Sequence, residues 1–141
     1  MFEQHSTTDK VQQPIITIAI PAYNRSNEIT HVLRGMRPLF DSDNIEILVV
    51  DDGSTPELKF EKDVQHRNLT LVRNEENIGF FENFIKIVDL SKGTYIVYLN
   101  DDDFLINENV PSLLTFLSSS SASFISTKFY RNKTLYRGKQ K

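Results

Sequence analysis

Apolar residues in this chain alternate between short continuous runs and stripes with helical spacing. Continuous runs rich in β-branched residues are typical of buried strands, and they cover residues 15–20, 45–50, 69–73, 94–99 and 123–129. Between these runs, apolar side chains recur every three or four residues, which places them on one face of a helix. Three such stripes lie within residues 29–36, 81–88 and 110–117. The pattern therefore predicts strands and helices in alternation.

Individual residues indicate where helices begin and end. Ser26 is the expected N-cap of the first helix, and Glu28 falls in the first turn, where the helix dipole favours a carboxylate. Thr55-Pro56 predicts the start of a weaker helix, because proline suits the first helical turn. Gly93 is placed to end the helix that contains residues 81–88.

Strands joined by helical crossovers predict an α/β fold with a mostly parallel sheet and helices on both faces. The apolar runs at residues 15–20, 45–50 and 94–99 suit central strands that are covered on both sides. In such sheets, ligands bind beyond the carboxyl ends of the strands. Polar residues gather at that edge, since they follow the first four strands at residues 21–25, 51–54, 74–79 and 100–103.

The most specific of these segments is the acidic triplet Asp101, Asp102 and Asp103. Three adjacent carboxylates repel one another, so their place after a buried strand favours a bound cation. Mg²⁺ and Mn²⁺ prefer oxygen ligands and typically combine one or two carboxylates with phosphate oxygens of a substrate. The alternative is a solvated acidic turn that caps the next helix.

Other residues at this edge allow two interpretations each. Asp51 and Asp52 either belong to a turn or accept a hydrogen bond from a ligand, for example from a base N–H or a ribose hydroxyl. Tyr23 either stacks on a ring or is an amphipathic rim residue. Arg25 and Arg73 either contact phosphate or pair with the surplus acids.

Composition narrows the class of protein. The chain has 141 residues, of which 39% are hydrophobic, and this suits one folded domain. It has no cysteine, which excludes disulfides and cysteine-based zinc sites, and its three histidines show no metal-ligand spacing. Phe80, Phe81 and Phe84 are predicted to belong to the core. The sequence has neither an apolar run of membrane-spanning length nor the layout of a signal peptide, so we expect a cytoplasmic protein.

The net charge of −3 conceals an asymmetry. Residues 1–108 hold 10 Lys/Arg and 19 Asp/Glu, which gives −9, whereas residues 109–141 hold six Lys/Arg and no acid, which gives +6. An acidic body of this kind does not match a nucleic-acid-binding domain. The basic end is either a solvated tail or a contact for an anionic membrane surface or an acidic partner.

Four segments together carry a family resemblance. They are IAIPAYNR at residues 18–25, ILVVDDGST at 47–55, RNEENIG at 73–79 and GTYIVYLNDDD at 93–103. Because these segments occur in this order and at this spacing, the chain resembles the family 2 glycosyltransferases, which have the GT-A fold. The resemblance implies inverting transfer of a sugar from a nucleoside-diphosphate sugar, with a UDP-sugar as the expected donor. The acceptor would be a saccharide, a lipid or a protein, as in polysaccharide biosynthesis.

The resemblance also implies roles for individual residues. Pro21 and Tyr23 match positions that line the base, and Asp52 matches the carboxylate that binds it. The acidic DxD motif, which meets ribose and metal, corresponds either to residues 100–102 or to residues 101–103. The implied nucleotide-binding set is Pro21, Ala22, Tyr23, Arg25, Asp52, Asn77, Gly79 and Asp101. The implied ligands of Mn²⁺ or Mg²⁺ are Asp102 and Asp103.

One part of the family pattern is not matched. The catalytic base is an Asp or Glu well downstream of the acidic motif, yet no acid follows Glu108, which itself lies too near the motif. Two hypotheses follow: the donor-binding part of a glycosyltransferase, or a non-catalytic module that binds a nucleotide sugar or a partner protein. A metal-dependent phosphotransfer domain would use the same triplet, but the sequence lacks a clear nucleophile-plus-lysine arrangement.

The expected organisation has three parts. Residues 1–13 form a flexible segment, residues 14–130 form a GT-A nucleotide-sugar-binding domain that is incomplete at its carboxyl end, and residues 131–141 form a basic tail. The tail allows peripheral membrane contact. The incomplete domain makes a homo-oligomer or a partner chain an expected feature.

Overall fold

The computed structural model describes residues 12–124, which build one parallel four-stranded sheet. The strands are β1 (Ile16–Ala22), β2 (Ile45–Asp51), β3 (Leu69–Arg73) and β4 (Tyr95–Tyr98). Their order across the sheet is β3-β2-β1-β4, and each neighbouring pair runs parallel. All four carboxyl ends therefore lie at one edge, as the alternating pattern predicted.

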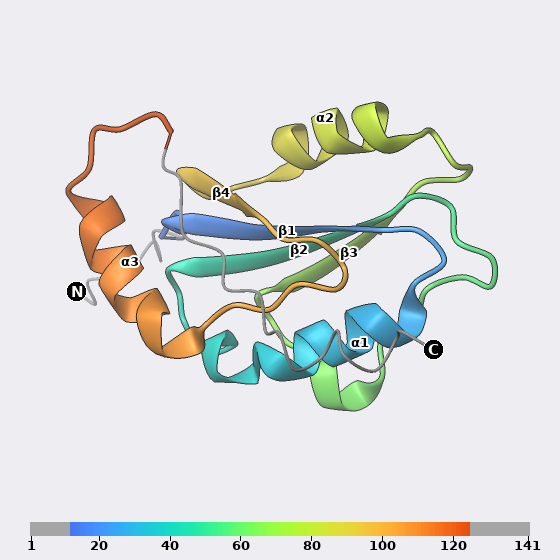
Figure 1. Cartoon of the computed structure of the whole chain (residues 1–141), viewed down its shortest axis with the longest axis horizontal. Coiled ribbons are helices and arrows are strands. Elements are labelled where there is room, and N and C mark those ends of the chain that lie inside the picture. The colour runs from blue at the N-terminus through green and yellow to red at the C-terminus, as the bar shows by residue number, and fades with distance from the viewer. Residues whose placement is uncertain (1–11, 125–141) are drawn as a thin grey trace, which may run out of the picture.

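Helices cover both faces of this sheet, which confirms the predicted α/β architecture. The helices are α1 (Ser26–Gly35), α2 (Phe80–Leu90) and α3 (Val110–Ser118), with short 3-10 turns η1 (Arg37–Leu39), η2 (Lys62–Val64) and η3 (Asn107–Asn109). Figure 1 shows α1 on one face of the sheet and α2 on the other. Within the described residues, no helix is both long enough and apolar enough to cross a bilayer.

The core has two parts because alternate residues of a strand face opposite sides of the sheet. Ile16, Ile18 and Ile20 of β1 belong to the larger part, which also contains buried residues of α1 and α3. Ala19 belongs to the smaller part, with Ile87 of α2 as its buried helical residue. The side that faces α1 is therefore much better filled than the side that faces α2.

This imbalance overturns two expectations about the core. Phe80, Phe81 and Phe84 are 63%, 75% and 41% exposed, because α2 buries only Asn83 and Ile87. The run at residues 94–99 is not a central strand either, since β4 pairs only with β1 in the described sheet. Ile96 of β4 is accordingly 38% exposed. Apolar side chains alone could not distinguish a covered strand from an edge strand.

Three predicted helix boundaries are also wrong. Ser26 is the first residue of α1 rather than its N-cap, and the N-cap position is taken by Arg25, which makes no side-chain capping bond. No helix begins at Thr55-Pro56, where the Thr55 N–H instead donates to Asn24 Oδ1 at 2.8 Å. α2 ends at Leu90, three residues before Gly93.

Gly93 has a packing role instead. A Cβ at this position would lie 2.3 Å from the backbone nitrogen of Thr17 in β1. The predicted flexible segment and basic tail lie largely or wholly outside the described residues, as do positions 125–129 of the predicted fifth strand. Residues 123 and 124, which are described, belong to no strand.

Candidate nucleotide-binding site

A cavity of about 300 Å³ opens at the carboxyl edge of the sheet. Seven of the eight predicted nucleotide-binding residues line it: Pro21, Ala22, Tyr23, Asp52, Asn77, Gly79 and Asp101. The exception is Arg25, which lies nearby and places its Nε 3.5 Å from Asp101 Oδ2. Residues from four separate segments thus meet at the edge where a ligand was expected.

The segments after β1 and β2 are tied together by Asn24. Its backbone φ of 56° lies in the left-handed region, which asparagine tolerates better than most residues. The Asn24 N–H donates to Ser54 Oγ at 2.8 Å, and its side-chain oxygen accepts the N–H of Thr55. The pocket wall formed by Tyr23 is therefore fixed to the turn that carries Asp52.

Asp51 and Asp52 have different roles although they are adjacent. The Asp51 carboxylate is 1% exposed, and it accepts hydrogen bonds from Ser54 and from Arg73 Nη1, the latter at 2.7 Å. Arg73 is thereby committed to an acid, which was one of the two interpretations of this residue. Asp51 holds the turn together and does not line the cavity.

Asp52 reaches the cavity and holds the loop that follows β3. Its Oδ1 accepts the N–H of Ile78 at 2.9 Å, and its Oδ2 accepts the N–H of Gly79 at 3.0 Å. Asn74 Nδ2 donates to the same Oδ1 at 2.8 Å. Asp52 is only 5% exposed, so these donors stabilise a carboxylate that is almost removed from water.

Gly53 allows the two loops to touch. Its φ is 75°, and a Cβ there would lie 2.6 Å from the carbonyl carbon of Glu76 and 2.7 Å from the nitrogen of Asn77. Only glycine adopts this backbone at no steric cost while it permits so close an approach. The position of Asn77 in the cavity wall therefore depends on the absence of a side chain at residue 53.

The acidic triplet does not form a closed cage for a metal. Asp101 is half-buried at the cavity, Asp102 is exposed, and Asp103 Oδ2 accepts a hydrogen bond from Asn100 Nδ2 at 2.8 Å. Among the described residues, no group of three metal-ligating side chains converges. Such a donor set fits a divalent ion shared with a diphosphate, because Mg²⁺ commonly takes one or two carboxylates and completes its shell with phosphate and water.

Burial and charge act on the acids at the cavity mouth. Burial raises the pKa of the Asp101 carboxyl, while the guanidinium of Arg25 opposes this and the carboxylates of Asp102 and Glu28 add to it. Burial also raises the pKa of Tyr98, and the negative charge of Asp101 contributes in the same direction. The hydroxyl oxygen of Tyr98 is buried and has no hydrogen-bond partner among the described residues.

Four residues in the cavity wall were not in the predicted set: Phe80, Asn83, Tyr98 and Asn100. Asn100 belongs to one of the two registers of the acidic motif, so its presence could have been anticipated. Tyr98 ends β4, so its place at the carboxyl edge of the sheet is the sequence signal for it. No sequence signal separates Asn83 from the other polar residues of α2, which are Glu82, Lys86 and Asp89. Phe80 was predicted to belong to the core, and only its exposure in the structure shows that it does not.

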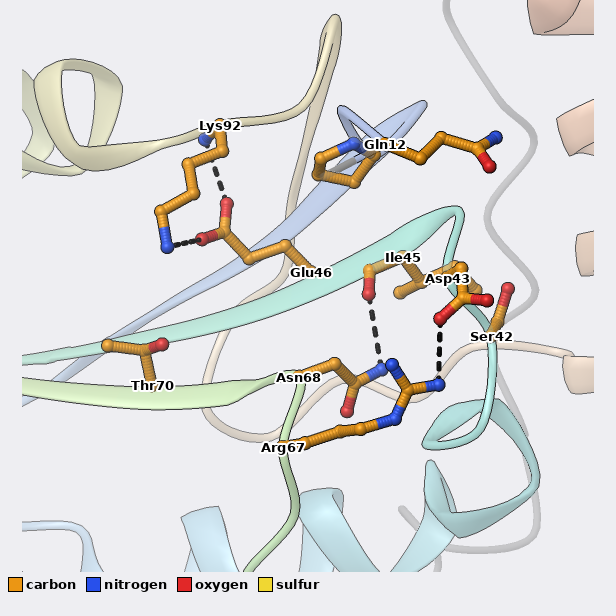
Figure 2. Close-up of a pocket in the computed structure, with 10 residues that line it drawn as sticks. Gln12, Ser42, Asp43, Ile45, Glu46, Arg67, Asn68, Thr70 and Lys92 are labelled. Atoms are coloured by element: carbon orange, nitrogen blue, oxygen red, sulfur yellow. Dashed lines mark hydrogen bonds and ion pairs between the residues drawn. The ribbon is translucent and has the colours of Figure 1, made fainter. Parts of the chain in front are cut away.

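A larger cavity, of about 600 Å³, lies at the opposite edge of the sheet and is shown in Figure 2. None of the predicted site residues lines it. Its charged groups already have partners, since Glu46 accepts the N–H of Lys92 at 2.8 Å and Arg67 pairs with Asp43 at 2.7 Å. Although this cavity is larger, its charged side chains are already paired with one another, so it is not a better site for an anionic ligand than the cavity at the carboxyl edge.

Known structures share the fold of this chain. TarS of S. aureus, solved in complex with UDP, matches with a TM-score of 0.60 at 22% identity over 73% of this chain and 32% of that chain. The mannosyltransferase PcManGT of Pyrobaculum calidifontis, solved with GDP-Man and Mn²⁺, matches with a TM-score of 0.58 at 21% identity over 78% of this chain and 34% of that chain. These likenesses confirm the GT-A fold.

Sequence relatives identify the family. An uncharacterized glycosyltransferase of Haemophilus influenzae is 31% identical over 100 residues, which are 71% of this chain and 33% of the relative. The abequosyltransferase RfbV of Salmonella typhimurium is 30% identical over 117 residues, which are 79% of this chain and 35% of the relative. The chain thus spans about a third of the length of these relatives. The model of glycosyl transferase family 2 matches residues 17–140, and the chain belongs to this family.

Proposed function

We propose that this chain is the donor-binding part of an inverting glycosyltransferase. In this proposal, the cavity at the carboxyl edge of the sheet binds a nucleoside-diphosphate sugar, for which a UDP-sugar is the expected donor, together with Mn²⁺ or Mg²⁺. The observation that carries the proposal is the meeting of seven predicted nucleotide-binding residues, from four separate segments, around one cavity.

The ligands of the structural relatives support this proposal. TarS was solved with UDP-GlcNAc as well as with UDP, and PcManGT was solved with GDP-Man and Mn²⁺. A nucleoside diphosphate is the chemical element that these ligands share. We therefore assign the diphosphate and its ion to the mouth of the cavity, where Asp101 and Asp102 follow β4.

Several side chains in or beside the cavity have a proposed function that suits their surroundings. Tyr23 is 47% exposed at the rim, so its ring is free to stack on a base. Asp52, held by backbone donors, accepts an N–H from the base. The buried hydroxyl of Tyr98 has a hydrogen bond to give to a ligand. Asp102 and Asp103 are the residues that would hold the divalent ion, and Asp101 beside them would meet the nucleotide.

The departure of the nucleoside diphosphate is the chemical problem that this site addresses. Negative charge grows on the diphosphate as the glycosidic bond breaks, and a divalent ion, when bound, stabilises that charge. Asp102 supplies an exposed carboxylate for the ion, while Arg25 keeps Asp101 at the cavity by a contact of 3.5 Å. These residues hold the leaving group and leave the acceptor to other parts of the enzyme.

The catalytic base belongs to the part of the family length that this chain does not span. No Asp or Glu follows Glu108 in the sequence, and the relatives are about three times as long as the matched region. We accordingly assign the acceptor site, whether for a saccharide, a lipid or a protein, to that part. The same lack of an acid favours, as a second candidate, a module that binds a nucleotide sugar without catalysis.

Calorimetric titration of the chain with UDP and UDP-sugars, with and without Mn²⁺, tests the proposal. We expect binding that strengthens with Mn²⁺, and we expect Asp102→Ala to abolish only the metal-dependent part. Asp43→Ala removes an exposed carboxylate at the opposite edge of the sheet and serves as the matched control. The proposal fails if the folded chain binds no nucleotide under any of these conditions. Sugar transfer by the chain alone would exclude the non-catalytic candidate.

A further inference from the structure

A buried polar network formed by Asn74, Asn83 and Lys86 lies next to Asp52 and has no role in the proposed function so far. Asn74 and Asn83 are each 3% exposed, and Lys86 of α2 reaches them from the side. Lys86 Nζ donates to Asn74 Oδ1 at 2.7 Å, and Asn74 Nδ2 donates to Asp52 Oδ1 at 2.8 Å. The network therefore ends on the carboxylate that faces the cavity.

The direction of every bond in this network is determined by its chemistry. An ammonium group only donates, so the oxygen of the Asn74 amide must face Lys86 and its NH₂ group must face Asp52. The same NH₂ group donates to Asn83 Oδ1 at 2.9 Å, and this leaves the Asn83 NH₂ group directed at the carbonyl of Val50. Asn74 cannot flip without losing the bond from Lys86.

This arrangement limits what Asp52 can still accept. A carboxylate has about four acceptor positions, two on each oxygen. Oδ1 is filled by Asn74 Nδ2 and the N–H of Ile78, while Oδ2 holds the N–H of Gly79 alone. One position, on Oδ2, remains for a ligand.

We propose that Asn74, held by Lys86 and Asn83, is a specificity-determining residue that restricts Asp52 to a single ligand N–H. This inference rests on the proposed function of the cavity. A ring with one imino N–H between two carbonyls, as in uracil and thymine, matches the single free position. Guanine presents N1–H and N2–H₂ side by side and requires two acceptors, so one of its buried donors would lack a partner.

Titration of the chain with UDP, dTDP and GDP, at one Mn²⁺ concentration, measures this selection. The three ligands carry the same diphosphate, so contacts to phosphate and metal cancel in the ratio of affinities. We expect UDP and dTDP to bind at least about tenfold more tightly than GDP, because an unpaired buried donor is costly. Asn74→Ala returns a second acceptor to Asp52, and the ratio should fall to about threefold or less.

Two further variants keep the test decisive. Asn68→Ala is the matched control, since the side-chain NH₂ group of Asn68 also donates a hydrogen bond, here to the backbone carbonyl of Ile45 at 3.1 Å, but lies at the opposite edge of the sheet (Figure 2). It should lower stability and leave the ratio unchanged. Lys86→Met removes the ammonium but leaves the NH₂ group of Asn74 on Asp52 and Asn83, so the ratio should stay close to that of the unaltered chain.

Three results would overturn the inference. They are GDP affinity equal to or above that of UDP in the unaltered chain, an unchanged ratio in Asn74→Ala, and an equal fall of the ratio in Asn68→Ala or Lys86→Met. Any of these leaves the proposed function standing as long as a nucleotide binds. If the folded chain binds none of the three nucleotides, the proposed function fails and the inference fails with it.

Discussion

Replacement of Gly53 by alanine should damage both the stability of the fold and the nucleotide site. At a φ of 75°, a residue with a side chain pays about 1–2 kcal/mol for the left-handed conformation. The new Cβ would also lie 2.6 Å from the carbonyl carbon of Glu76, whereas carbon atoms at optimal contact are about 3.5–4.0 Å apart. The two atoms that the Cβ would meet, the carbonyl carbon of Glu76 and the nitrogen of Asn77, belong to the backbone, so the loops after β2 and β3 must separate. We expect a total loss of at least about 2 kcal/mol in the free energy of unfolding.

Urea denaturation followed by circular dichroism measures this loss, and UDP titration of the folded variant measures the effect on the site. Gly35→Ala is the matched control, because its Cβ would make only an ordinary contact of 3.4 Å with Phe104 Cδ1 and its backbone is not left-handed. We expect the control to change stability by less than about 1 kcal/mol and to keep UDP affinity unchanged. If Gly53→Ala matched the unaltered chain in both measurements, the two loops would not be interlocked as described.

Other substitutions test the core and the charges separately. Ile87→Ala should lower the free energy of unfolding by about 2–5 kcal/mol, because Ile87 is fully buried. Phe81→Ala should change it by less than about 0.5 kcal/mol, because Phe81 is 75% exposed. Equal effects of the two substitutions in urea denaturation would contradict the core assignment. Arg73→Met should lower the free energy of unfolding by about 2–3 kcal/mol, because the Asp51 carboxylate would remain buried with only its bonds to Ser54. An unchanged midpoint of urea denaturation would refute this prediction. Asp101→Asn should leave the melting temperature at pH 7 unchanged or raised: burial raises the pKa of Asp101 in the folded chain above its value in the unfolded chain, so the ionised carboxylate at pH 7 lowers the stability of the fold. A clear drop in the melting temperature would show that the charge of Asp101 stabilises the fold.

The sheet could be predicted from the sequence because its signals are local. Each strand is a short apolar run, and four of the five predicted runs correspond to strands of the described sheet. The location of the site could also be predicted, because parallel strands bring all the residues that follow them to the same edge of the sheet. These inferences require only the order of apolar and polar residues.

Position within the fold could not be predicted in the same way. β4 is as apolar as a central strand, yet it lies at the edge of the described sheet. Phe81 and Ile87 are both apolar residues of α2, but one is exposed and the other is buried. What decides these outcomes is how much of the sheet is available to cover each side chain, and this depends on the whole arrangement rather than on spacing.

The roles of individual polar residues in the site also depended on three-dimensional contacts. Asp51 and Asp52 are chemically identical neighbours, and only their partners show that Asp51 holds a turn while Asp52 faces the cavity. Asn74 and Asn83 are nine residues apart, and a bond of 2.9 Å joins them because the loop after β3 leads into α2, which packs against β1 and β2. No spacing rule for a helix or a strand links those two positions.

The proposed binding of a nucleoside diphosphate in the cavity at the carboxyl edge of the sheet can be followed at each backbone amide. The measurement is a two-dimensional ¹H–¹⁵N NMR titration of the labelled chain with UDP and Mg²⁺. We expect the largest shift changes at the amides of Tyr23, Asp52, Gly79 and Asp101, with little change at Asp43 and Glu46 around the larger cavity. Shift changes concentrated at Asp43 and Glu46, or no saturable change at any residue, would contradict the proposed binding.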